Sequence, residues 1–310
     1  MTIRAIKLYL SSVFVYFLGY LLLKIIPFYN NFLSKQSFDV FFYFLLFFII
    51  SSPVYYYFTT NRYSTNKPFI FLISLIKIIK KEKLNFKDKT TARFLLVKIF
   101  FLPLMLQFFI NNYNWFLQNL KSATFFAIMI TLIFTIDTFI FFFGYSFEFK
   151  FLKNRVKSVE PTFFGWFVAI ICYPPFNGVV GNYVAWGAND HAYFWSDGIT
   201  MMFRVVIILL LLIYLSATFA LGAKASNLTN RGIVTKFPYS IVRHPAYISK
   251  NLMWWVTLIP VMNFEFATGM GVWSIIYFFR AYTEEKHLSL DKDYIDYKKK
   301  VKWKFIPFIY

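Results

Sequence analysis

The chain has 310 residues, of which 59% are hydrophobic and 24% aromatic, while only 15% are charged. Soluble domains are about 45–50% apolar and about 25% charged, so this composition excludes a protein that folds wholly in water. The net charge of +19 fits basic loops that face anionic lipid on the cytosolic side of a membrane. We therefore expect anionic lipid head groups as partners of these charges, and no nucleic acid.

Apolar segments in chain order predict an all-α, multi-pass transmembrane bundle of six spans. They lie at 8–28, 38–58, 95–111, 123–145, 162–173 or slightly beyond, and 198–221, and several approach or exceed the roughly 18–20 residues that cross a bilayer. No small-residue cleavage site follows the first segment, which predicts a retained helix rather than a signal peptide. The shorter run 68–81 predicts an amphipathic helix at the interface.

The distribution of basic residues predicts which loops face the cytosol. Lys and Arg are frequent before the first span, between the second and third spans (Arg62 among them) and after the fourth, whereas residues 173–203 hold none before Arg204. This alternation places both the N-terminus and the C-terminus in the cytosol. We expect a transmembrane region at 1–221 and a cytosol-facing cofactor-binding region at 222–310.

A divided apolar segment at 252–279 interrupts the cytosolic C-terminal part. Two flanks on one side of the membrane require an even number of crossings, so a single straight span is excluded. The middle, 260–271, contains Pro260, Asn263 and two glycines, which favours a bend. We predict a helical hairpin whose legs of about a dozen residues, roughly 18 Å each, reach only part of the way across.

Two polar clusters flank this hairpin and form the candidate site. The first runs from Gly232 to Tyr247 and includes Arg243-His244-Pro245; the second begins at Arg280 and continues through a Glu-Glu pair to Tyr294-x-x-Tyr297 and Phe305-Ile-Pro307. Arg and His donate hydrogen bonds to a carboxylate, and the glutamates accept them from an ammonium group. Together they suit a zwitterionic amino acid that carries an aromatic base.

These motifs resemble the isoprenylcysteine carboxyl methyltransferase family and the related phospholipid methyltransferases, over roughly residues 222–307. The resemblance implies an integral membrane enzyme that binds S-adenosylmethionine and methylates a lipophilic or lipidated substrate drawn from the bilayer, here in a bacterial-type subgroup of the inner membrane. By carry-over it implies a set of cofactor-binding residues: Lys236, Pro238, Tyr239, Arg243, His244, Tyr247, Glu284 and Glu285. It assigns no catalytic residue, and we expect no metal. Phe237 and Lys304 depart from the family's usual Gly and Arg.

The sequence leaves the acceptor open between a carboxylate, which needs no base, and an amine, which needs Glu284, Glu285 or His244 as one. An NADPH-dependent membrane sterol or lipid reductase is the main alternative, because such proteins share Arg-His-Pro-x-Tyr followed by Trp-Trp, here Trp254-Trp255. A non-catalytic membrane protein or transporter is a third class.

Four further residues were weighed for a role. We expect His287 to be a solvated helix residue, and a metal site at His191 to lack ligands. Asp137, inside an apolar run, is either functional or hydrogen-bonded to a neighbouring helix. The single cysteine, Cys172, excludes an intrachain disulfide.

Overall fold

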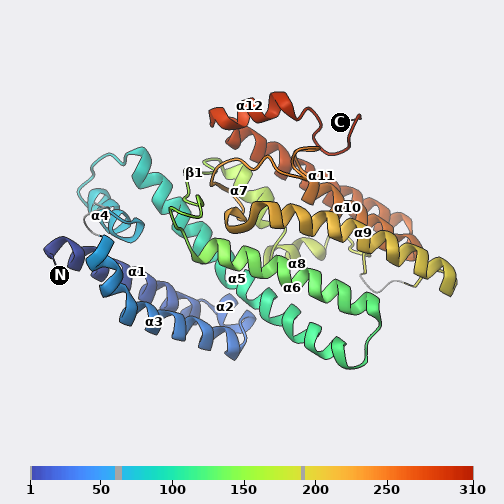
Figure 1. Cartoon of the computed structure of the whole chain (residues 1–310), viewed down its shortest axis with the longest axis horizontal. Helices are drawn as coiled ribbons and strands as arrows, with labels where there is room; N and C mark the ends of the chain where they lie inside the picture. The colour runs from blue at the N-terminus through green and yellow to red at the C-terminus, as the bar shows by residue number, and fades with distance from the viewer. Residues whose placement is uncertain (1, 60–64, 190–192, 310) are drawn as a thin grey trace. The chain divides into compact units, whose positions relative to one another are not determined.

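The computed structural model is almost entirely helical and describes residues 2–59, 65–189 and 193–309 (Figure 1). The chain divides into two compact units, residues 1–107 and 108–310. This division reflects spatial packing. The functional boundary that we expect near residue 221 lies elsewhere and stays a prediction.

The first unit is built from α1 (Ile3–Ile25), α2 (Pro27–Phe32), α3 (Lys35–Thr59), α4 (Lys67–Ile79) and the first part of α5 (Phe86–Ser122). A buried cluster of hydrogen-bonded polar side chains joins α1, α3 and α4. Ser12 of α1 and Tyr56 of α3 share a hydrogen bond of 2.7 Å, and the amide of Asn66 donates to both hydroxyls. Asn66 also caps α4, so one side chain ends a loop and ties the helices together.

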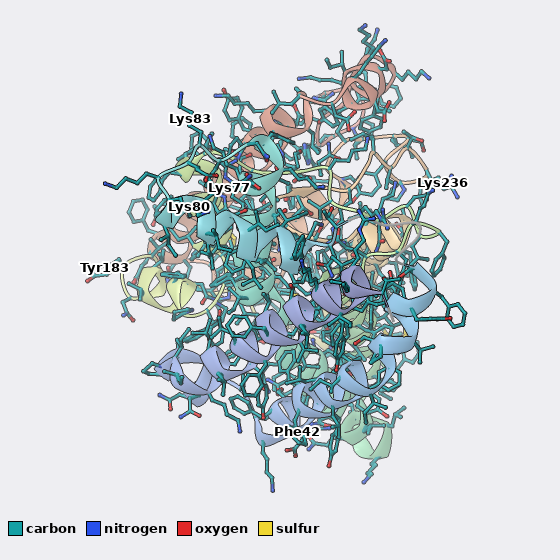
Figure 2. The ribbon with its side chains drawn as sticks, turned by 90° about the vertical axis from the view of Figure 1, so that its left-hand side faces the viewer. Phe42, Lys77, Lys80, Lys83, Tyr183 and Lys236 are labelled. Atoms are coloured by element: carbon teal, nitrogen blue, oxygen red, sulfur yellow. The ribbon has the colours of Figure 1, made fainter. Side chains whose placement is uncertain are left out.

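The helix α4 matches the run expected to lie at the membrane interface. Lys77 pairs with Asp88 at 2.7 Å, whereas Lys80 and Lys83 are exposed. Figure 2 shows Lys80 and Lys83 projecting at the end of this unit opposite to Phe42, an exposed apolar residue of α3. The interfacial position itself stays a prediction, as does the cytosolic side. Arg62 lies outside the described residues.

The second unit continues with α6 (Phe125–Ser146), α7 (Phe163–Ile170), α8 (Phe176–Gly181), α9 (Asp197–Leu221), α10 (Pro245–Leu258), α11 (Phe264–Leu288) and α12 (Lys292–Lys300). Short 3-10 helices, η1 (Gly222–Lys224) and η2 (Ile259–Val261), follow α9 and α10. Two short antiparallel strands, β1 (Ser158–Val159) and β2 (Thr229–Asn230), pair Ser158 with Asn230. They bring the loop before α7 beside the loop after α9.

The core of this unit lies where α9 packs against α6 and α10. Ile133, Ile207, Leu211 and Met253 are almost completely buried there. Inside the same contact, Asp137 accepts hydrogen bonds of 2.7 Å from Tyr214 and from Thr218 of α9. Of the two roles considered for Asp137, the structure therefore shows the hydrogen bond between helices.

Five helices of the described chain are long and apolar enough to cross a membrane: Ile3–Ile25, Lys35–Thr59, Phe86–Lys121, Phe125–Ser146 and Asp197–Lys224. The expected span at 162–173 is not a continuous helix, which corrects that prediction. It forms α7, whose eight residues rise only about 12 Å, followed by turns and α8. The sequence Tyr173-Pro174-Pro175 ends the helix because proline lacks the backbone N–H that a helix interior needs.

The broken segment nevertheless runs along the whole of α11. Near its start, Phe164 packs on Phe279, with ring centroids 5.5 Å apart. Near its end, Trp186 packs edge-on against Trp273, and Ala185 lies against Gly269. The segment thus follows α11 without forming a long helix itself. The total of six crossings stays a prediction.

The C-terminal hairpin consists of α10 and α11, which run antiparallel because Trp254 contacts Tyr277 while Tyr247 contacts Glu284. Its legs are 14 and 25 residues long, so the first leg is close to the expected dozen residues and the second is longer. Apolarity ends at Phe279, but the helix continues because its following charges find partners. A helix of 25 residues is about 38 Å long, but its end from Arg280 onward is charged, so how far this leg reaches into a membrane stays a prediction.

Two glycines of α11 give a matched test of the packing between α11 and the broken segment. A Cβ added at Gly269 would lie 2.2 Å from the Ala185 carbonyl oxygen, whereas Gly271 has open space around it. We expect Gly269→Ala to destabilise the protein by about 1–3 kcal/mol, as overpacking does, and Gly271→Ala to be neutral or stabilising. Thermal unfolding of the two purified variants measures this, and equal melting temperatures would contradict the packing.

Candidate active site

Because α10 and α11 form a hairpin, the turn that contains Arg243 and His244 (the Arg-His turn) lies beside the C-terminal tail. The backbone N–H groups of Arg243 and His244 donate to the carbonyls of Trp303 and Lys304, both at 2.9 Å. His244 is the N-cap of α10, and Pro245 occupies the first helical position, where its missing N–H costs nothing. Loop, helix start and tail are thus fixed to one another before any side chain is considered.

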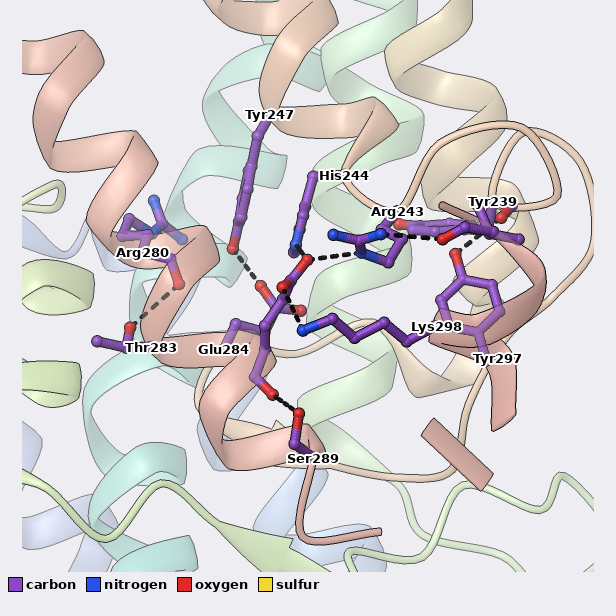
Figure 3. Close-up of polar contacts among 12 residues, drawn as sticks. Tyr239, Arg243, His244, Tyr247, Arg280, Thr283, Glu284, Ser289, Tyr297 and Lys298 are labelled. Carbon is purple, nitrogen blue, oxygen red and sulfur yellow. Dashed lines mark hydrogen bonds and ion pairs between the residues drawn. The ribbon is translucent and has the colours of Figure 1, made fainter. Parts of the chain in front are cut away.

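Glu285 is the centre of a charged network whose other members, Arg243, His244 and Lys298, are labelled in Figure 3. Its Oε1 accepts from Arg243 Nε at 2.7 Å and lies 3.1 Å from His244 Nε2, while Lys298 Nζ is 3.5 Å from Oε2. Burial alone would raise the pKa of Glu285, but the hydrogen bonds from His244 and Arg243 outweigh it and hold the pKa well below its usual range. Glu285 therefore stays ionised and holds the Arg-His turn against α11.

Arg243 also fastens the tail. Its Nη1 donates to the carbonyls of Val301 at 2.9 Å and Lys302 at 2.6 Å, just after α12 ends. Beside it, the Tyr297 hydroxyl donates to the Tyr239 carbonyl at 2.7 Å. Most of the donors of this guanidinium are thus directed at the protein itself, which favours a positioning role for Arg243.

A cavity opens next to this network, between α11 and the paired loops. Five of the eight expected site residues line it: Tyr239, Arg243, His244, Tyr247 and Glu284. The other three do not: Lys236 projects outward as an exposed side chain (Figure 2), Pro238 is buried elsewhere, and Glu285 faces the Arg-His turn. A cofactor role for any of the eight stays a proposal.

Glu284 and Glu285 lie on two different faces of α11. Successive helical residues point about 100° apart, so Glu284 enters the cavity while Glu285 points to Arg243. Glu284 Oε2 accepts from the Tyr247 hydroxyl at 2.7 Å. Glu284 is thus the carboxylate of the doublet that a bound cation can reach.

Arg280 lies one helical turn before Glu284 and also lines the cavity. It is only 6% exposed, donates to Asn227 at 3.0 Å, and stacks on the rings of Tyr247 and Tyr277. Within the described residues, no carboxylate lies within ion-pair distance of it. Arg280 begins the second polar cluster but is not among the cofactor-binding residues that the resemblance implies, although an arginine directly after a long apolar run is the kind of residue that marks a site.

A second polar group lines the cavity from the side of β1 and α7. His287 is 5% exposed and Glu160 4%, so the expectation of a solvated His287 was wrong. The His287 Nε2 and the Ser158 Oγ are 2.9 Å apart, although 129 positions separate these residues. Sequence reasoning missed this group because neither β1 nor β2 has a pattern long enough to predict their pairing.

The two departures from the family pattern also have defined places. Phe237 is exposed, whereas Lys304 is buried with its Nζ 4.8 Å from the Phe278 ring. Burial lowers the pKa of Lys304. His191 lies outside the described residues, and within them no group of three metal-ligating side chains occurs.

Comparison with known families supports the same class of protein. Residues 194–294, which include α9, α10, α11 and the first residues of α12, match the phospholipid methyltransferase family model. This confirms the resemblance over that region, and it supports a membrane methyltransferase that acts on lipids. No curated protein matches the chain significantly.

Glu285 and Glu284 offer neighbouring substitutions whose expected costs in stability differ. Glu285→Gln leaves Arg243 and His244 without their shared carboxylate and should cost about 3–5 kcal/mol of unfolding free energy, as breaking a buried pair does. Glu284→Gln should cost far less, because Glu284 is exposed to the cavity. Chemical denaturation at pH 7 measures both.

Acid supplies an independent check on the same pair. The folded-state pKa of Glu285 lies below its ordinary value of 4.5, so its stabilisation is present above that pH and is lost as the pH falls further. The difference in unfolding free energy between the native protein and Glu285→Gln should therefore shrink as the pH falls below about 4. A constant difference at all pH values would show that the pair contributes nothing through ionisation.

Proposed function

We propose that this chain transfers a methyl group from S-adenosylmethionine to a lipophilic acceptor, a carboxylate or an amine, at the cytosolic face of a bacterial inner membrane. The observation that carries the proposal is that Glu284 and Arg280 line the same cavity. They lie four residues apart on α11, about 6 Å along its axis. One accepts from an ammonium group and the other donates to a carboxylate, which are the two charged groups of an α-amino acid.

The remaining cavity residues fit the rest of such a cofactor. His244 and Tyr247 stack with ring centroids 5.4 Å apart and an interplanar angle of 3°, so they present flat faces of the kind that bind a cation or a purine. When bound, S-adenosylmethionine supplies an electrophilic methyl group on sulfur. Glu284, Arg280 and Tyr247 would fix its amino-acid end, and Tyr239 would lie along it as the resemblance implies, whereas Lys236 and Pro238 do not line the cavity.

The apolar part of the cavity favours a lipid acceptor. Phe141 of α6, Ala169 of α7 and Leu221 of α9 line it together with Leu228, and these helices come from the apolar part of the chain. An acyl or prenyl tail could remain among these side chains while its polar end reaches Glu284. Catalysis in such a site rests on alignment of the reactants and exclusion of water.

The reductase alternative rests on Trp254-Trp255, and these residues have other contacts. Trp254 packs against Trp186 and Tyr277, and Trp255 donates to Ser274 at 3.0 Å. Neither is among the residues that line the cavity. The pair is thus accounted for by packing within the hairpin and against Trp186.

Calorimetry with S-adenosylhomocysteine tests the proposal directly. The purified chain should bind it, and Glu284→Gln should weaken binding at least tenfold, because a hydrogen bond to a charged group contributes about 1.5–3 kcal/mol. Lys286→Gln, an exposed residue on the same helical turn, serves as the matched control and should bind as the native chain does. Binding of NADPH but not of S-adenosylhomocysteine would support the reductase instead.

A further inference from the structure

The cavity contains a second carboxylate, Glu160, which the cofactor site does not use. It follows β1, and its carboxylate lines the cavity beside His287 of α11. Both side chains are nearly fully buried. Glu160 lies outside the residues matched by the family model, so nothing in that match assigns it a role.

The first turn of α7 fixes the position of Glu160. Oε1 accepts from the backbone N–H and the hydroxyl of Thr162, which is the N-cap of α7. Gly165 lies directly over the carboxylate: a Cβ there would be 2.5 Å from Glu160 Cγ. A capping function is therefore fully served by Oε1.

The second oxygen points elsewhere. Glu160 Oε2 lies 3.8 Å from His287 Nδ1, which is too long for a hydrogen bond. On the other side of the ring, Nε2 bonds to Ser158. A nitrogen atom placed about 2.9 Å from each of Nδ1 and Oε2 would bridge the gap with ordinary hydrogen-bond lengths. The spacing suits an inserted amine better than a direct contact.

We propose that His287 and Glu160 form the proton-accepting pair for an amine acceptor, with Ser158 holding the ring; this rests on the proposed methyltransferase function. The cavity then has two cation sites. Glu284 receives the ammonium of the methyl donor on the side of the Arg-His turn, and Glu160 receives the acceptor's head group on the side of β1. His287 and Glu284 are three residues apart on α11, so the two sites are adjacent.

The proton and electron transfers balance without a further reactant. An ammonium acceptor R–NH3+ gives one proton to His287 Nδ1, with Nε2–H donating to Ser158 Oγ, and the imidazolium is stabilised by Glu160. The freed nitrogen lone pair forms the new N–C bond with the methyl carbon. The C–S bond breaks and its electron pair stays on sulfur, which becomes a neutral thioether. The product R–NH2+–CH3 leaves, and the imidazolium releases its proton to water.

Other charged groups around the pair belong to several elements. Arg243, His244, Arg280 and Glu284 line the same cavity. Behind Ser158, the neighbouring Lys157 pairs with Asp291 at 2.8 Å. Arg243 and Lys157 are each paired with another carboxylate, and Glu160 Oε2 lies 3.8 Å from His287 Nδ1, so Glu160 is placed to stabilise a charged His287.

The test uses the full chain in nanodiscs of phosphatidylethanolamine and phosphatidylglycerol, with methyl-labelled S-adenosylmethionine. We expect kcat/KM of the native chain for methylation of the ethanolamine amine to fall as the pH is lowered and His287 becomes protonated. This fall is the acid limb of the pH profile. His287→Gln should lower kcat by about 10²–10⁴-fold, the range of general base catalysis, and should abolish that acid limb. Its affinity for S-adenosylhomocysteine should be unchanged, and Lys286→Gln should match the native chain throughout.

Glu160→Gln gives a second, independent readout. Loss of the carboxylate makes a charged imidazole less favourable, so the acid limb should move to lower pH as the rate falls. This variant decides the question if His287→Gln does not fold. A purely structural role would lower the rate of both variants without moving the limb, and that result overturns the proposal.

The outcomes separate this proposal from the one on which it rests. A native chain that binds S-adenosylhomocysteine but does not methylate the ethanolamine amine overturns the proton-accepting pair and leaves the methyltransferase function standing. Native rates and an unchanged acid limb in His287→Gln do the same. A native chain without affinity for S-adenosylhomocysteine overturns both.

Discussion

Glu285 is a buried carboxylate, and the arrangement of the C-terminal region depends on how its charge is compensated. Removing a carboxylate from water costs several kcal/mol unless partners replace the solvent. Arg243 and His244 supply these partners from the start of α10, 41 and 42 positions away in sequence. The compensation is possible only if α10 and α11 fold back on each other, so the ion pair and the hairpin require one another.

The same network sets the form of the cavity. Because Arg243 Nη1 donates to the Val301 and Lys302 carbonyls, the tail after α12 is held beside the Arg-His turn. With Glu285 turned to this task, its neighbour Glu284 is turned to the cavity, as is Arg280 one turn earlier. A doublet of acidic residues thus supplies one group that holds the structure and one that can meet a ligand.

The sequence predicted those parts of the fold that depend on local pattern or on charge. The long apolar helices and the turn-back between the two polar clusters follow from length, proline, glycine and basic residues. The expected ends of the hairpin were wrong, because apolarity stops at Phe279 while the helix is prolonged by paired charges. The expected fifth span is not one continuous helix, because the prolines after Tyr173 do not allow the apolar helix α7 to continue.

Within the site, sequence reasoning found the residues that lie in one continuous motif and missed those that reach it through long-range contacts. Arg243, Tyr247 and Glu284 carry a recognisable spacing. Glu160 and Ser158 do not. Their position depends on two paired strands of two residues each, and such short strands have no periodic pattern that would predict them. His287 looked like a solvated helix residue because its partners come from that strand pair.

The residues that sequence reasoning found lie on one wall of the cavity, and Glu160, which it missed, lies on the other. One wall, formed by the Arg-His turn and α11, lies almost wholly within residues 194–294 that match the phospholipid methyltransferase model. The other, formed by Glu160, Gly165 and Ala169, comes from the broken segment that runs along α11. Any molecule that fills the cavity must contact both walls. The wall within the matched region can therefore keep a shared donor chemistry, while the broken segment is free to set which acceptor fits.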